Sequence, residues 1–241
     1  MQFRGDRAIE RPRHPSGIEK PGPSAERNVE YMNTETTTLT TIDSVTLEAT
    51  DPEVASRFYR DAFDLDDRVR ISTTDAATSG FRGFTMSLVA PQPANVTALF
   101  DSAVAAGADI LTPLAKSLWG FGGVVQAPDG AIWNLATSTK KDNAPASRAF
   151  DHLVLLLGVE DVSASKRFYT ERGLAVGKSF GSYVDFDLPG SPIGLGLYKR
   201  RALAKSAGVS PEGSGSHRIR ITGDGGTFVD PDGFEWDAAG R

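Results

Sequence analysis

Apolar and polar positions follow two rhythms along the chain, and the same order of rhythms occurs twice. Residues 42–49 alternate with the period of two that is typical of a strand. Residues 51–63 place their apolar side chains on one helical face, behind Asp51 as a candidate N-cap. The same strand and helix return at residues 150–158 and 161–173, so the pattern predicts an internal repeat.

The rest of each copy is predicted mainly as strands. A second helix is expected at residues 95–107, ending at Gly107. Further strands are expected at residues 67–73, 83–90, 121–127, 131–137, 175–180, 183–188, 193–198 and 217–223. The second copy lacks the helix that would follow residues 217–223, because only Asp-Gly-Gly separates that strand from the next one.

Each copy closes on a similar motif. The chain reads "QAPDGAIWN" at residues 126–134 and "VDPDGFEWD" at residues 229–237. Asp-Pro-Asp-Gly has the residues that a type I turn favours, so the turn itself needs no functional explanation. The copies differ in the polar residue after the tryptophan, which is Asn134 in the first and Asp237 in the second.

Composition narrows the class of protein. The net charge of −5 over 241 residues argues against a nucleic-acid partner, and we interpret the basic run at 198–205 as a solvated face. The chain has no cysteine, which excludes thiolate nucleophiles and Cys-ligated zinc. Its apolar runs are too short to span a bilayer, and no apolar signal region follows the N-terminus, so we expect a cytoplasmic protein.

The order of these elements resembles the vicinal oxygen chelate superfamily, which contains glyoxalases, bleomycin-resistance proteins and extradiol dioxygenases. The resemblance covers residues 42–137 and 150–239 and includes Arg-Phe-Tyr in the first helix of each copy. It implies an α+β fold, a tandem repeat of two glyoxalase-like domains built from βαβββ modules with curled, mostly antiparallel sheets. We expect four segments: a disordered tail at 1–40, the first domain at 41–138, a linker at 139–149 and the second domain at 150–241.

The resemblance also implies three metal-ligand positions in each repeat. In the first repeat they hold residues that bind divalent ions poorly: Ser44, Phe84 or Thr85, and Asn134. In the second repeat they hold His152, His217 and Asp237. Two imidazoles and a carboxylate suit Fe(II), and Mn(II), Ni(II) or Zn(II) are alternatives. Glu235 is a candidate catalytic base, or an alternative ligand.

Strand alternation gives these side chains directions. His217 is expected to share a face with Ile219 and Ile221, pointing into an apolar cup, while the arginines between them point the other way. Trp236 should face away from Asp237 and the cup, so we predict that it is buried against another part of the chain.

Two functions from different classes follow. The first is a metal-dependent enzyme of glyoxalase or dioxygenase type, working in the second cup on vicinal oxygens of a small molecule. The second is a metal-free protein of bleomycin-resistance type that sequesters an aromatic metabolite or an antibiotic. Trp119, Phe121 and Trp133 are candidates for stacking on such a ligand, unless they are core residues. Either protein is expected to be a monomer with an internal pseudo-dimer, or a homodimer.

Overall fold

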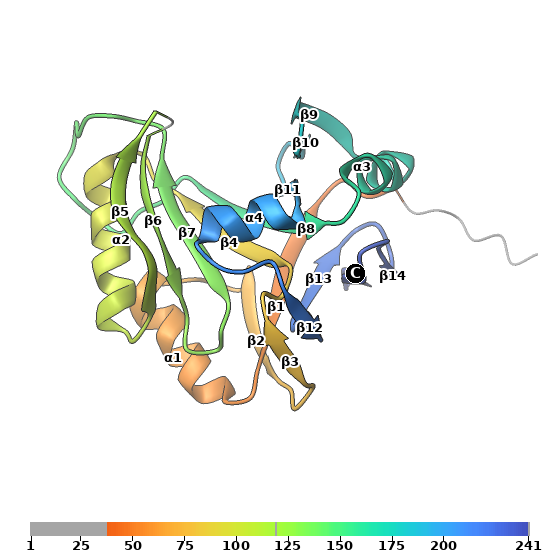
Figure 1. Ribbon diagram of the computed structural model, residues 1–241, viewed down its shortest axis with the longest axis horizontal. Helices are drawn as coiled ribbons and strands as arrows, with labels where there is room; N and C mark the ends of the chain where they lie inside the picture. The colour runs from red at the N-terminus through yellow and green to blue at the C-terminus, as the bar shows by residue number, and fades with distance from the viewer. Residues whose placement is uncertain (1–37, 119, 241) are drawn as a thin grey trace, which may run out of the picture. The chain divides into compact units, whose positions relative to one another are not determined.

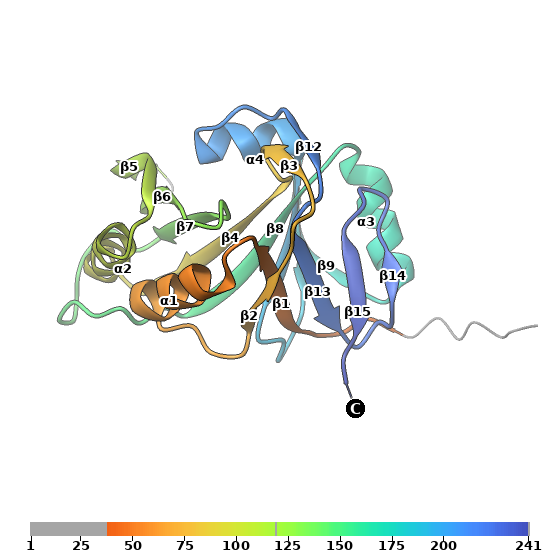
Figure 2. The same cartoon turned by 90° about the horizontal axis from the view of Figure 1, so that it is seen from below.

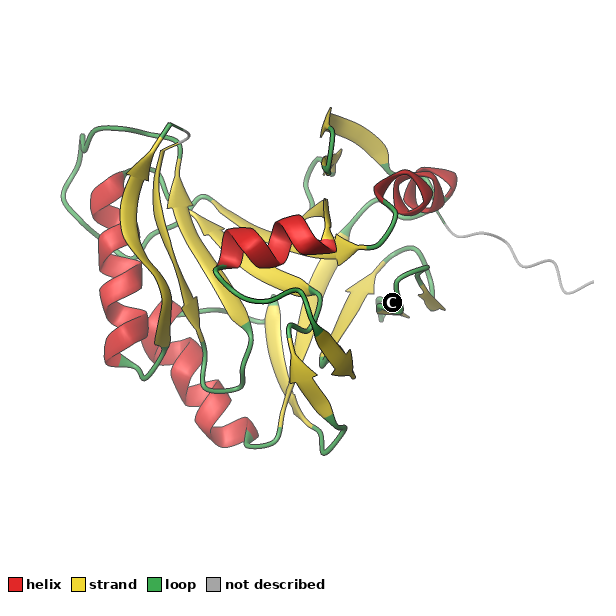
Figure 3. Cartoon of the chain, viewed as in Figure 1, coloured by secondary structure: helices red, strands yellow, loops and turns green. Residues whose placement is uncertain are grey.

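Strands and helices are mixed throughout the described part of the chain, as Figure 3 shows. The computed structural model describes residues 38–118 and 120–240, which belong to one compact unit. The helices are α1 (Pro52–Phe63), α2 (Pro93–Ala105), α3 (Val162–Glu171) and α4 (Arg200–Ala207). The strands are β1 (Ile42–Ala49), β2 (Val69–Thr73), β3 (Thr78–Gly80), β4 (Phe84–Val89), β5 (Asp109–Ser117), β6 (Gly120–Gln126), β7 (Ile132–Thr137), β8 (His152–Val159), β9 (Ala175–Phe180), β10 (Tyr183–Asp187), β11 (Gly194–Lys199), β12 (Gly213–Gly215), β13 (Ile219–Gly223), β14 (Phe228–Val229) and β15 (Glu235–Ala238).

The larger sheet has eight strands in the order β5-β6-β7-β4-β8-β11-β10-β9 (Figure 1). It contains two complete βαβββ modules, β4-α2-β5-β6-β7 and β8-α3-β9-β10-β11. The modules meet where β4 runs antiparallel to β8, with Ser87 opposite Val154. Most strand pairs are antiparallel, and the parallel pairs include the joins of first to last strand in both modules. The expected fold class is therefore confirmed.

The smaller sheet joins the start of the first repeat to the end of the second. Its order is β14-β15-β13-β1-β2, with Val45 of β1 opposite Ile221 of β13. As expected, no helix lies between β13 and β14, both within the described part of the chain. The eight-stranded sheet and the five-stranded sheet thus each take strands from both repeats. The division into domains 41–138 and 150–241 stays a prediction.

Helix boundaries follow local chemistry where the sequence made it visible. The Asp51 carboxylate accepts a hydrogen bond from the Val54 amide at 3.0 Å, so Asp51 is the N-cap of α1. Helix α4 was not expected, because its basic residues suggested a solvated segment. Leu203, Ala204 and Ala207 form one apolar stripe on α4 and are fully buried.

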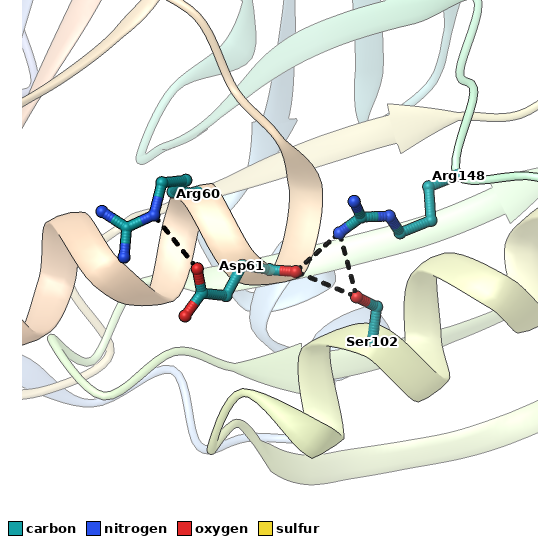
Figure 4. A network of polar contacts seen from close by, with 4 residues as sticks. All are labelled: Arg60, Asp61, Ser102 and Arg148. Carbon is teal, nitrogen blue, oxygen red and sulfur yellow. Dashed lines mark hydrogen bonds and ion pairs between the residues drawn. The ribbon is translucent and has the colours of Figure 1, made fainter.

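The expected linker at residues 139–149 is fastened to both helices of the first repeat. The amides of Asn143 and Ala144 donate to the Gln92 side chain just before α2. Figure 4 shows Arg148 donating to the backbone carbonyl of Asp61 on α1 and to Ser102 on α2. Residues 38–40 of the expected tail are also part of the structure, and Leu39 is fully buried. Residues 1–37 lie outside the described residues.

The repeated closing motif ties a helix to its turn. In the first copy, the Tyr59 hydroxyl of α1 donates to the Asp129 carboxylate at 2.8 Å. The same hydroxyl accepts from the indole Nε1 of Trp133 at 3.4 Å. We call these three residues the first clasp. It joins the tyrosine of Arg-Phe-Tyr to the Pro-Asp-Gly turn and the tryptophan.

The second copy has an equivalent second clasp, made of Tyr169, Asp230 and Trp236. The Tyr169 hydroxyl donates to Asp230 at 2.6 Å and accepts from the Trp236 indole at 3.3 Å. Here the carboxylate precedes the proline of the turn, whereas Asp129 follows it. Trp236 is 1% exposed, so its predicted burial is confirmed.

Candidate functional site

The eight-stranded sheet has one face that we call the inner face, and α4 lies on it (Figure 2). Helices α2 and α3 pack on the opposite face. Side chains alternate along each strand, so buried residues such as Leu155 and Leu197 point to the helices. Val154 and Gly196 take the intervening positions and point to the inner face.

The larger cavity has a volume of about 740 Å³ and lies beside β8, β10 and β11. Its lining includes Val154, Lys178, Tyr183, Asp185 and Gly194. One carboxylate oxygen of Asp185 accepts a hydrogen bond from the backbone amide of Lys178. The other oxygen accepts a hydrogen bond from the Tyr183 hydroxyl at 3.2 Å. Burial, and then the neighbouring Asp185 carboxylate, hold the pKa of Tyr183 well above its ordinary value, so this phenol stays protonated at neutral pH. The volume suits a small ligand.

A smaller cavity of about 330 Å³ lies over β6 and β7, beside the predicted ligand-binding aromatics. Phe121 lines it and is half-buried. Trp133 does not line it, since its side chain is 0% exposed and packs 4.9 Å from Phe63 in the core. The ligand role expected for Trp133 has no support in this geometry. Trp119 lies outside the described residues.

The five-stranded sheet carries a charged cluster on the face opposite its buried residues. The Arg220 guanidinium has Nη2 3.2 Å from Glu235 Oε2 and 3.7 Å from Glu48 Oε1, and Nη1 3.6 Å from Asp237 Oδ2. The four side chains come from the neighbouring strands β1, β13 and β15. We call them the Arg220 cluster. Asp237 and Glu235, the predicted ligand and base, are therefore ion-paired to a cation that the chain itself supplies.

His217 lies just before β13, in a different setting. Its Nδ1 is 2.5 Å from the Arg82 carbonyl oxygen, and its Nε2 is 3.1 Å from the Asp232 carbonyl oxygen. The ring stacks on Phe234 with 4.1 Å between centroids. Both ring nitrogens are thus engaged with backbone, and the ring bridges the segment before β4 to the turn before β15.

His152 begins β8 in the eight-stranded sheet and lines the larger cavity. Among the described residues no hydrogen bond or ion pair of its side chain is found. The three predicted metal ligands therefore lie in three different parts of the structure: the eight-stranded sheet, the segment before β13 and the Arg220 cluster. Within residues 38–118 and 120–240, no group of three or more His, Asp or Glu side chains is placed to hold a metal ion.

No protein-family model matches the sequence, and no curated protein matches it. Among solved structures, glyoxalase I from Zea mays is 15% identical, with a TM-score of 0.56, over 82% of this chain and 91% of that one. A proposed dioxygenase from Bacillus subtilis is 12% identical, with a TM-score of 0.51, over 78% of this chain and 70% of that one. The chain has the fold of the vicinal oxygen chelate superfamily. The expected resemblance is confirmed at the level of fold.

In this glyoxalase-like fold, β13 keeps the expected alternation of its isoleucines and Arg220, but its apolar face does not line a cup. Ile219 and Ile221 are buried in the core, so Arg220 between them faces the charged cluster. Arg218 has φ of 53°, a left-handed conformation that interrupts the alternation between His217 and the strand. The expectation of an apolar cup lined by the isoleucines was wrong, because the core takes the apolar face and leaves the charged face outside.

The residues present do not fit the metal site that the resemblance implies. The carboxylates of Asp237 and Glu235 are both ion-paired to the Arg220 guanidinium. A divalent ion needs carboxylates that are free to coordinate it. Each ring nitrogen of His217 faces a backbone carbonyl oxygen, which occupies the position that a metal ion would take. His152 belongs to the other large sheet.

Sequence reasoning missed the cavity residues Lys178, Tyr183, Asp185 and Gly194. One signal was present: the run Gly-Leu-Gly-Leu at 194–197 leaves alternate positions of a strand without side chains. None of the helices in the described ranges is both long and apolar enough to cross a membrane.

Proposed function

We propose that this chain binds a small molecule on the inner face of the eight-stranded sheet and that binding needs no metal ion. One observation carries the proposal: the ligand-sized cavity and the carboxylate-rich cluster belong to different sheets. The cluster that resembles a metal centre already has Arg220 as its cation. The cavity has a large volume and a lining of mixed polarity, which are properties of small-molecule sites.

The chemistry of the cavity favours binding over catalysis. A general base needs a group that is poised to take a proton near neutral pH. Asp185 is engaged by the Lys178 amide and the Tyr183 hydroxyl, and the raised pKa of Tyr183 leaves no phenolate. These contacts fix the wall of the cavity and orient a bound molecule. The metal-dependent alternative would require His152, His217 and Asp237 to act together.

The test uses the full chain, purified without an affinity tag. Metal content is measured by mass spectrometry, and a mixed fragment set is screened by thermal shift with and without a chelator. We expect substoichiometric metal and ligand-induced shifts that the chelator leaves unchanged. Asp237→Asn should match wild type in metal content, as should the control Asp109→Asn on the exposed edge strand β5. Stoichiometric metal that is lost in Asp237→Asn alone would contradict the proposal and favour the metal-dependent enzyme.

A further inference from the structure

Where strand β11 borders the larger cavity, two of its positions carry no side chain, and we call them the glycine strip. Leu195 and Leu197 are buried in the core, so Gly194 and Gly196 occupy the positions on the inner face. Glycine weakens the interior of a strand, and it often marks a place where a ligand or another backbone approaches closely. Neither glycine has a positive φ, so backbone conformation does not explain why they are glycines.

The two glycines have different neighbours. A Cβ at Gly196 would lie 2.9 Å from Leu156 Cδ2 and 3.3 Å from Tyr183 Cε2, so the Tyr183 ring already lies against this glycine. A Cβ at Gly194 would meet nothing closer than Val154 Cγ2 at 3.4 Å, which is an ordinary contact. The backbone at Gly194 is therefore open to the cavity, with Tyr183 and Val154 also in its lining.

The Tyr183 ring is held in place before any ligand arrives. It lies opposite Tyr198 of β11, with ring centroids 4.7 Å apart and planes inclined by 44°. Tyr198 in turn packs against the apolar cluster of α4. The Tyr183 hydroxyl is fixed by its bond to Asp185. A preorganised ring loses little entropy when a flat molecule packs on it.

Positively and negatively charged side chains, and one histidine, line the cavity around the β11 glycines and the Tyr183 ring. Lys178 and His152 line the cavity, and no side-chain bond is found for either among the described residues. Asp185 and Asp187 line the same cavity with negative charge. The lining therefore offers hydrogen bonds to substituents in several directions and does not select a ligand by net charge.

We propose that the cavity takes a flat aromatic ring bearing hydrogen-bonding substituents, seated on the backbone at Gly194 between Tyr183 and Val154. The inference rests on the proposed function and deepens it. The bare backbone admits the face of the ring, Tyr183 packs against it, and Lys178 and Asp185 bind its polar substituents.

The test compares a matched pair of uncharged probes by calorimetry: 4-hydroxybenzamide and its saturated analogue trans-4-hydroxycyclohexanecarboxamide. We expect the aromatic probe to bind wild type about tenfold more tightly, the upper end of what aromatic packing contributes. Tyr183→Ala should weaken it by a similar factor, while Tyr183→Phe should keep most of the affinity. Gly194→Val should abolish binding, because a Cβ there makes only ordinary contacts and the added methyl groups take the place of the ring.

Gly240→Val is the matched control, since an added Cβ there meets no atom within 4 Å. Urea unfolding of each variant checks that it is folded. Equal affinity for the saturated probe would overturn ring recognition and leave small-molecule binding intact. Aromatic binding that is indifferent to Gly194→Val would place the ring elsewhere and overturn the inference. If neither probe nor any member of the mixed fragment set binds wild type, the proposed function fails as well.

Discussion

The second clasp gives the sharpest test of what holds this fold together. Tyr169→Phe removes a single hydroxyl that is fully buried. That hydroxyl donates to the Asp230 carboxylate at 2.6 Å and accepts from the Trp236 indole at 3.3 Å. No water can replace it without opening the core, so both partners would lose a contact.

The expected cost follows from these two losses. A hydrogen bond to a charged group contributes about 1.5–3 kcal/mol, and a buried N–H left without an acceptor costs about 1–3 kcal/mol. Asp230 keeps its bonds from the amides of Asp232 and Phe234, so it is not stripped of partners. We therefore expect Tyr169→Phe to lower the free energy of unfolding by about 3 kcal/mol, a large part of the roughly 5–15 kcal/mol of a typical domain.

The assay is urea unfolding at neutral pH, followed by tryptophan fluorescence. Tyr59→Phe, which removes the matching hydroxyl of the first clasp, should cost a similar amount. Tyr198→Phe is the control, because no hydrogen bond of its hydroxyl is found in the described ranges, and it should cost less than about 0.5 kcal/mol. A double-mutant cycle of Tyr169→Phe with Asp230→Asn should show coupling above about 1 kcal/mol. Additive effects, or a cost of Tyr169→Phe equal to that of the control, would refute the reasoning.

Three further predictions concern charge and burial. Burial, and then the neighbouring carboxylates, raise the pKa values of Tyr59 and Tyr169, so their stabilisation is complete below the unfolded value near pH 10 and is lost above it. Unfolding at pH 10–11.5 should show a loss of about 1.4 kcal/mol per pH unit from each of these two tyrosines, and the double Phe variant should lose less stability over this range by that amount. Ser44→Ala removes a buried hydroxyl for which no hydrogen-bond partner is found among the described residues. The free energy of unfolding should therefore rise by about 1 kcal/mol in urea unfolding, and a fall would contradict this. Arg220→Met should cost about 1 kcal/mol at low salt and less in 1 M NaCl, whereas a salt-independent cost would indicate a packing role.

Local chemistry made much of the fold predictable. Asp51 and Pro52 mark the start of α1 in the sequence, and the structure begins the helix there. Strand alternation is similarly visible in residues 42–49, which form β1. Such signals depend on neighbours along the chain, which is why the doubled pattern was enough to indicate the glyoxalase-like fold.

The candidate site was less predictable, because it depends on which strands meet. Nothing in the sequence near His152 shows that its strand pairs with β4, or that β13 pairs with β1. The two faces of β13 were distinguishable, but the assignment of one face to the core needed the tertiary structure. The same limit hid α4, whose buried Leu203 lies within a run of basic residues.

The repeated motif explains why the two halves share a fold and differ at their surfaces. Asp129 and Asp230 come from different positions of the turn, yet each accepts from the tyrosine of its clasp. The geometry therefore requires a buried carboxylate beside the tyrosine and tolerates a change in where it comes from. Asn134 and Asp237 follow the two tryptophans and point away from the core, where no clasp constrains them. Selection can thus alter these faces without disturbing the core, so the glycine strip on β11 and the Arg220 cluster are independent features of one framework.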